Sequence, residues 1–188
     1  GLNYWDPDPK TGQTEGQTEI LNARYATHAD WSAGIELELS CHPRGGAPVL
    51  KENRVVRIRA PDATGSYRID WTFTFTPVGK GVLFERTPIL GQAGGVAYGG
   101  YAGLSMRMAA ATRAWTFANS EGATGESATH GKPARWLDFS GKTAGGTEGG
   151  VAILDHPGNL RHPSPWYVNQ EMPYFSPAVL FNAPHTLA

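Results

Sequence analysis

Cysteine is almost absent from this 188-residue chain. Cys41 is the only one, which excludes an internal disulfide bond and a zinc centre built from several thiolates. No base is evident near it in the sequence, so we interpret Cys41 as a small strand residue and not as a nucleophile.

An excess of charge of either sign is also lacking. The chain has 16 Lys and Arg residues against 17 Asp and Glu, for a formal net charge of -1. Nucleic acids and anionic membrane surfaces bind proteins through basic patches. Because the charge of this chain is nearly balanced, we expect no nucleic-acid partner.

Long apolar runs are missing as well. The longest uncharged segment, Thr87 to Met106, has the length of a membrane span but contains six glycines and a proline. It is too poor in apolar surface to cross a bilayer. We therefore predict a soluble protein with no membrane span, in which this segment is a glycine-rich loop that leads into a strand.

Turn-forming residues are abundant. The chain has 24 glycines and 14 prolines, yet 40% of its residues are hydrophobic, which indicates many turns between strands and not disorder. The length suits one domain with a substantial core. We predict a single β-sandwich domain over residues 1–188.

Alternating apolar and polar residues predict the strands. Segment 34–42 places Ile, Leu and Leu on one face and Glu, Glu and Ser on the other. In segment 67–76 one face holds five large side chains: Tyr67, Ile69, Trp71, Phe73 and Phe75. We expect this row to form a major part of the core, although an exposed aromatic row is an alternative as a platform for sugar rings.

The remaining segments favour the same fold class. Segment 81–86 is expected to pair with the strand before it, and segment 176–181 to be the last strand. Ala109 to Ala114 is a helix candidate that is too short to be stable alone. About ten short strands with few or no helices predict an all-β fold, an antiparallel β-sandwich or a partial barrel.

The strongest candidate for a site is the loop after the apolar segment Val151 to Leu154, which we expect to be a buried strand. Three prolines and Gly158 exclude a helix or a strand there. The segment 155–167 also gathers polar and aromatic groups: Asp155, His156, Asn159, Arg161, His162, Trp166 and Tyr167. Such density next to a core strand is typical of a functional site. The alternative is a loop whose Asp and Asn form turn hydrogen bonds and whose Trp is a buried plug.

Several irregular motifs occur in one order along nearly the whole chain. They are NYWDP, RIRAPDATGSYRIDWTFTF, GGVAYGGYAGLSMRM, ARWLDFSG, GVAILDHPGNLRHPSPWYV and MPYFSPAVLF. Together they resemble the bacterial family of unknown function labelled "methane oxygenase PmoA-like". The membrane methane monooxygenase subunit needs several apolar helices of about 20 residues, which this sequence does not predict.

The resemblance has implications for fold and function. It implies a β-sandwich similar to galactose-mutarotase-like domains, of the supersandwich type. It also implies a carbohydrate connection, because relatives occur among genes of polysaccharide degradation and sugar dehydrogenases. Family members are longer at both ends, with a histidine-rich segment upstream and a further strand downstream. We therefore expect this chain, which begins with Gly1, to be partial at both ends. The compartment is left open, with a periplasmic or secreted location as one option.

The first functional hypothesis is an enzyme that acts on sugars by general acid–base chemistry. Asp155 is expected as the base or the orienting carboxylate, and His156 or His162 as the general acid/base. A guanidinium, from Arg107 or Arg161, is expected to clamp an oxyanion or a carboxylate. The expected catalytic residues are Asp155, His156, His162 and Arg107.

Two alternatives stay open. One is a carbohydrate-binding or accessory module without catalysis, because aromatic and planar polar groups suffice for binding. The expected ligand-binding residues are Arg161, Trp166, Tyr167, Trp136, Tyr98, Tyr101 and Asn159, with Trp166 or Trp136 as the stacking surface. The other is a metal site formed by Asp155, His156 and His162 with His130, although their spacing matches no standard motif. We therefore assign no metal ligand, no cofactor and no oligomeric state.

Overall fold

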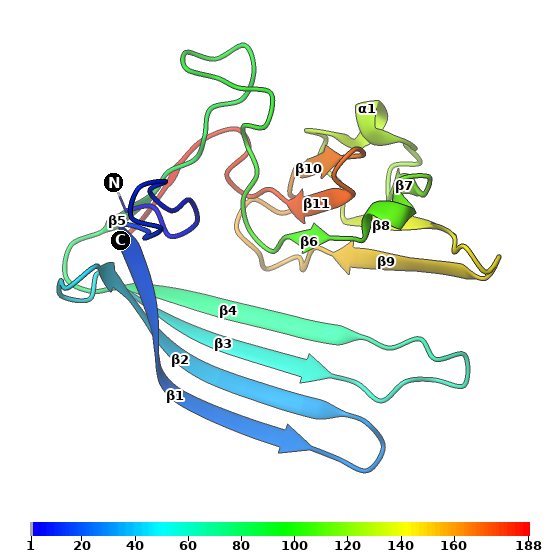
Figure 1. The fold of residues 1–188 in the computed structure, drawn as a ribbon, viewed down its shortest axis with the longest axis horizontal. Coiled ribbons are helices and arrows are strands. Elements are labelled where there is room, and N and C mark those ends of the chain that lie inside the picture. Colours follow the sequence, from blue (N-terminus) through cyan, green and yellow to red (C-terminus); the bar gives the residue numbers. More distant parts are fainter. Residues whose placement is uncertain (1) are drawn as a thin grey trace. The chain divides into compact units, whose positions relative to one another are not determined.

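The computed structural model of this chain describes residues 2–188, and nearly all of its regular structure is β-strand (Figure 1). The strands form several antiparallel sheets, and helical structure within the described residues is limited to a 3₁₀ turn at Ala110–Thr112 and to α1 at Glu126–Thr129. The prediction of an all-β fold with few helices is confirmed. The galactose-mutarotase-like subtype stays a prediction.

The chain divides into two compact units. Unit 1 comprises residues 1–83 and 186–188, and unit 2 comprises residues 84–185. Because compactness alone does not define a domain, the single domain over residues 1–188 stays a prediction.

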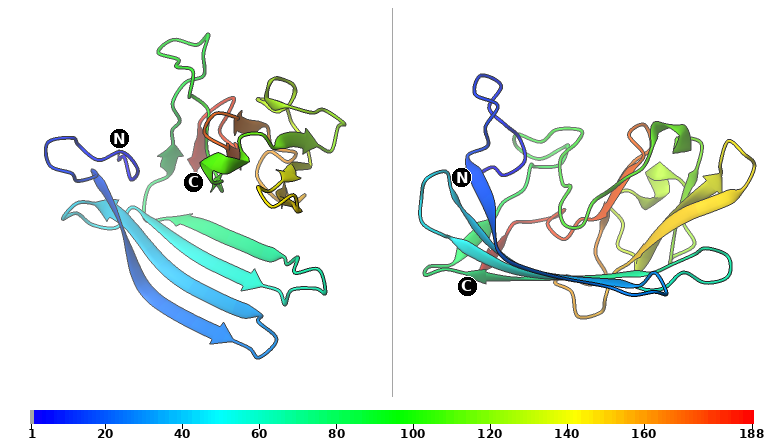
Figure 2. Two further views of the ribbon diagram at one scale, coloured as in Figure 1. Left: turned by 45° about the vertical axis from the view of Figure 1, so that its right-hand side comes forward. Right: turned by 60° about the horizontal axis from the view of Figure 1, so that its bottom comes forward.

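Unit 1 contains a four-stranded antiparallel sheet in the order β1-β2-β3-β4. Its strands are β1 at Gly16–Thr27, β2 at Ala33–Pro43, β3 at Leu50–Ile58 and β4 at Ile69–Pro77. The pairing of β1 with β2 shifts between Ile20 and Asn22, as at a β-bulge, and β1 bends along its length (Figures 1 and 2). The strands predicted from alternation over 34–42 and 67–76 are confirmed.

The prediction that the aromatic row of β4 forms a major part of the core is wrong. Trp71 is 42% exposed and Phe73 is 39% exposed. Both clusters of buried hydrophobic side chains in the described chain belong to unit 2. The face that carries the row is also crossed by an ion pair, since Glu52 lies opposite Phe75 and binds Arg54 at 2.6 Å. That face is therefore not purely apolar.

The pairing expected for segment 81–86 is also wrong. Val82–Phe84 (β5) pairs with His185–Leu187 (β12) and not with β4. A Cβ at Gly81 would lie 3.0 Å from the Leu187 carbonyl oxygen, so glycine permits this close approach of the two segments. The expected last strand over 176–181 is corrected too, because β11 ends at Pro177 and β12 is the last strand.

Unit 2 contains two three-stranded sheets. One, in the order β7-β8-β9, consists of Thr116–Asn119, Trp136–Lys142 and Glu148–Leu154. The other, in the order β10-β11-β6, consists of Trp166–Asn169, Tyr174–Pro177 and Met106–Arg107. Both contribute side chains to one hydrophobic cluster, so they pack as the two layers of a small sandwich.

Alternation along the strands of unit 2 fills this core. On β8, Leu137 and Phe139 are fully buried, and Phe117 of β7 stacks on Phe139 with ring centroids 4.2 Å apart. Each such buried side chain stabilises the fold by about 1.5–3 kcal/mol. The predicted strand before the loop is confirmed as β9, but only one of its faces is covered, since Leu154 is exposed.

Candidate functional site

The loop after β9 begins where the pairing of β8 with β9 ends. The backbone N–H of Asp155 donates to the Arg135 carbonyl oxygen at 2.8 Å, which fixes the start of the loop. Two successive turns follow, in which the Asn159 N–H donates to the His156 carbonyl and the His162 N–H donates to the Asn159 carbonyl. These turns bring Asn159 and His162 back toward Asp155.

The Asp155 carboxylate is the centre of this loop, and its side chain is only 1% exposed. It accepts three hydrogen bonds: from Asn159 Nδ2 at 2.7 Å, from the Ser164 N–H at 2.8 Å and from His162 Nδ1 at 2.9 Å. An ionised carboxylate can only accept, so the imidazole Nδ1 carries the proton in this contact. In the neutral ring, Nε2 of His162 is then left as an acceptor.

The side chain of His162 is 18% exposed, whereas that of its partner Asp155 is almost fully buried. A partly exposed imidazole held by a buried carboxylate has the arrangement of a general base with its orienting group. The loop thus brings together three of the residues that the sequence placed in it, and we call Asp155, Asn159 and His162 the Asp155 cluster.

His156 does not join the Asp155 cluster. Its side chain is exposed, and its Nδ1 accepts the Gly158 N–H at 3.0 Å. This local bond makes His156 part of the turn and leaves it outside the Asp155 cluster.

Arg161 has a structural role in the loop, and its expected function as a clamp stays a prediction. Its backbone is in the left-handed region, with φ of 61°. The guanidinium donates to three backbone carbonyl oxygens, those of Val179, Ala183 and Pro184. With three of its five N–H donors, Arg161 thus fastens the loop to segment 179–184.

The two expected stacking tryptophans differ. Trp166 is fully buried in the core of unit 2 and donates its Nε1–H to the Ala134 carbonyl at 2.9 Å. It is the buried plug of the alternative interpretation, which corrects its expected role in ligand binding. Trp136 is half-buried on the face of β8 opposite to Leu137, which points into the core.

The remaining predicted residues lie on other segments. Arg107 is exposed on β6, in register with Tyr174 of β11, and Tyr98 is exposed in the glycine-rich loop. Tyr101 meets the edge of the Tyr167 ring, with centroids 6.0 Å apart. These residues are thus not brought together with the Asp155 cluster by any contact that the structure shows.

The metal alternative is not supported. Across residues 2–188, no three His, Cys, Asp or Glu side chains form a group that could hold a metal ion. His156 faces its own turn, and the ring of His130 contacts the backbone of Val168.

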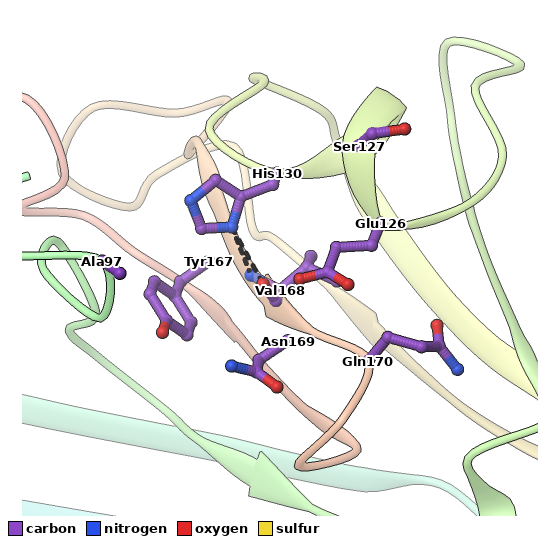
Figure 3. Close-up of a pocket in the computed structure, with 8 residues that line it drawn as sticks. All are labelled: Ala97, Glu126, Ser127, His130, Tyr167, Val168, Asn169 and Gln170. Atoms are coloured by element: carbon purple, nitrogen blue, oxygen red, sulfur yellow. Dashed lines mark hydrogen bonds between the residues drawn. The ribbon is translucent and has the colours of Figure 1, made fainter. Parts of the chain in front are cut away.

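Sequence reasoning missed a pocket of about 600 Å³ in unit 2 (Figure 3). The lining comes from α1, from β10 and from residues next to these two elements. It includes Glu126, His130, Tyr167, Asn169 and Gln170. The segment 120–132 reads as a polar loop, and α1 is too short to be signalled. Two signals were present: Glu126 and His130 are four residues apart, and Tyr167 and Asn169 share one face of β10.

Tyr167 is the most perturbed group in this pocket. Burial raises the pKa of its phenol, the nearby charge of Glu126 adds to this, and a hydrogen bond with Asn169 acts in the opposite direction. The ring also meets His130 edge-on at 5.1 Å and Tyr174 at 5.6 Å. The pocket therefore places a carboxylate, an imidazole and a phenol close together.

Fold and site together define an all-β protein with a partly exposed histidine held by a buried aspartate and with a polar-aromatic pocket. The chain belongs to the family of unknown function DUF6807, whose family model matches residues 1–188. Neither the curated proteins nor the solved structures include one that matches it. Within residues 2–188, no helix has both the length and the apolar character needed to cross a membrane.

Proposed function

We propose that the protein acts on a carbohydrate by general acid–base catalysis, with His162 as the group that accepts and returns a proton. Asp155 is the positioning residue, because it holds the ring and fixes which nitrogen is free. The observation that carries the proposal is the 2.9 Å hydrogen bond between His162 Nδ1 and the buried carboxylate.

Physical chemistry makes His162 suitable for this role. Histidine is the side chain that most often acts as the general acid or base in enzymes. The Asp155 carboxylate stabilises the imidazolium that forms when Nε2 takes a proton, and it prevents the ring from presenting the wrong nitrogen. Removing such a group typically lowers the rate by about 10²–10⁴-fold.

Carbohydrate is proposed as the substrate on the basis of the sequence motifs. They resemble the bacterial PmoA-like family, whose relatives occur among genes of polysaccharide degradation and sugar dehydrogenases. The galactose-mutarotase-like subtype of the fold is part of the same proposal. The all-β fold with antiparallel sheets is compatible with it.

The test is a comparison of variants on a sugar panel. Wild type, His162→Gln and His156→Gln are incubated with monosaccharides and oligosaccharides, and ¹H NMR follows epimerisation, elimination and hydrolysis. We expect turnover of at least one sugar by wild type and by His156→Gln, which is the control because its ring is exposed and outside the Asp155 cluster. Full activity of His162→Gln, or no turnover of any sugar by wild type, would contradict the proposal.

A second candidate function is carbohydrate binding without chemistry, on the outer face of β8 and β9. A depression of about 590 Å³ there is lined by residues that include Asp138, Ser140 and Glu148. Trp136 lies on the same face of β8 as Asp138, because side chains two residues apart share a face. Titration calorimetry with the same panel tests it: binding that is lost in Trp136→Ala, with no product formed, would favour this function.

A further inference from the structure

The pocket between α1 and β10 has the size of a small-ligand site. Its volume of about 600 Å³ lies within the range of about 300–1,000 Å³ that is usual for such sites. It shares no residue with the Asp155 cluster, so ligand binding in this pocket can be tested independently of proton transfer by His162.

The charge of the pocket comes from one residue. Glu126 is its only acidic residue, and no lysine or arginine lines it. Glu126 is half-buried and forms no ion pair with any other residue in the part of the chain that the structure describes. Its side chain extends from α1 toward Val168 of β10 (Figure 3). A carboxylate with reduced access to water and no counter-ion attracts a cation.

The ring of His130 directs its Nδ1 at the backbone of Val168. Its Nδ1 lies 2.9 Å from the Val168 carbonyl oxygen and 3.2 Å from the Val168 amide nitrogen. Because Nδ1 is engaged with the Val168 backbone, Nε2 is the ring nitrogen left for a ligand.

The amide groups of the pocket are also short of free donors. Gln170 donates its Nε2 hydrogens to the carbonyl oxygens of Arg113 and Trp115, which leaves Oε1 as an acceptor. The side chain of Asn169 accepts the Met172 N–H through Oδ1 and forms a hydrogen bond with Tyr167. The pocket therefore offers the unpaired carboxylate of Glu126 and the free Oε1 of Gln170 as acceptors.

We propose that this pocket binds a small organic ligand that carries a protonated amine, with Glu126 as its counter-ion. An ammonium group has three donors and no acceptor, which complements the unpaired carboxylate and the free Gln170 Oε1. An anionic ligand meets repulsion from Glu126 and no basic partner. The volume allows a monosaccharide-sized body around the amine.

The experiment uses three sugars with the same ring and different charge. Glucosamine, glucose and glucuronate are titrated into the full chain by calorimetry, at a pH low enough to keep the amine protonated. We expect glucosamine to bind at least about tenfold more tightly than glucose, as a charge-assisted hydrogen bond requires, and glucuronate to bind most weakly. In Glu126→Gln, glucosamine should fall to the affinity of glucose, whereas glucose should be unaffected.

Glu121→Gln is the matched control. Glu121 is exposed, lies on the same segment and does not line the pocket, so this variant should keep the preference for glucosamine. Circular dichroism confirms that each variant is folded. Equal affinity for the three sugars, a preference that survives Glu126→Gln, or no binding of glucosamine would overturn the proposal. Because neither variant touches the Asp155 cluster, these outcomes are independent of the result for His162.

Discussion

Replacing Asp155 with alanine should destabilise the protein strongly, because the carboxylate is the common acceptor for three groups of its loop. The Ser164 N–H that donates to it belongs to a buried residue and loses its acceptor in the variant. An unsatisfied buried donor costs about 1–3 kcal/mol. Asn159 is exposed and His162 half-buried, so their donors can turn partly to water. We expect a total loss of about 2–4 kcal/mol in the free energy of unfolding.

Urea unfolding followed by tryptophan fluorescence measures this loss, and Asp62→Ala is the matched control. The Asp62 carboxylate also accepts three hydrogen bonds, from Thr64 and Ser66, but it is fully exposed in the turn between β3 and β4. When the Asp62 carboxylate is removed, water replaces it as the acceptor for the donors of Thr64 and Ser66. The loss in the free energy of unfolding should therefore be clearly smaller than for Asp155→Ala. If Asp155→Ala costs no more than Asp62→Ala, the argument from burial is refuted.

Three further predictions concern other parts of the chain. Gly141→Ala should destabilise unit 2 by about 1–3 kcal/mol in thermal unfolding, because the new Cβ would lie 2.5 Å from the Trp115 ring. The control is Gly145→Ala, which should be tolerated because its new Cβ would meet only a Thr143 side-chain atom, 3.9 Å away. Since burial raises the pKa of Tyr167, its contribution to stability should be complete below its unfolded pKa of about 10 and be lost as the pH rises through the folded pKa. Tyr167→Phe should flatten this alkaline loss in unfolding curves; an unchanged curve would contradict the assignment. Burial also raises the pKa of the Cys41 thiol, so it should react with a thiol reagent only after unfolding, and rapid reaction of the folded protein would refute this.

Local patterns predict the strands of this protein well, because alternation is a property of neighbouring residues. The exposed carboxylate of Glu38 and the buried side chain of Leu39 on β2 follow directly from it. The candidate loop was also predictable, since the prolines end β9 and concentrate polar groups after Leu154. The contacts of the Asp155 carboxylate span at most nine residues along the chain.

Roles that depend on distant segments were not predictable. The guanidinium of Arg161 finds its acceptors 18 to 23 residues further along the chain, and Trp166 finds its acceptor 32 residues earlier. A sequence shows that these side chains are long or aromatic, but it does not show that backbone carbonyls will meet them. Both therefore read as ligand-binding groups although they stabilise the loop and the core.

The pocket was missed for a related reason. Its two walls, α1 and β10, come from separate parts of the sequence, and neither wall has a strong signal by itself. A four-residue helix is too short for helical periodicity to be recognised. Only the fold brings the two segments together, through the parallel bridge between His130 and Trp166.

The most direct measurement of the central claim is the protonation pattern of the His162 ring, read from ¹⁵N chemical shifts and long-range ¹H–¹⁵N correlations. We expect the neutral ring to carry its proton on Nδ1 in wild type and to lose this preference in Asp155→Asn, in which the carboxylate is absent. A proton on Nε2 in wild type, or a tautomer that is the same in Asp155→Asn, would contradict the account of His162 as a base held by Asp155.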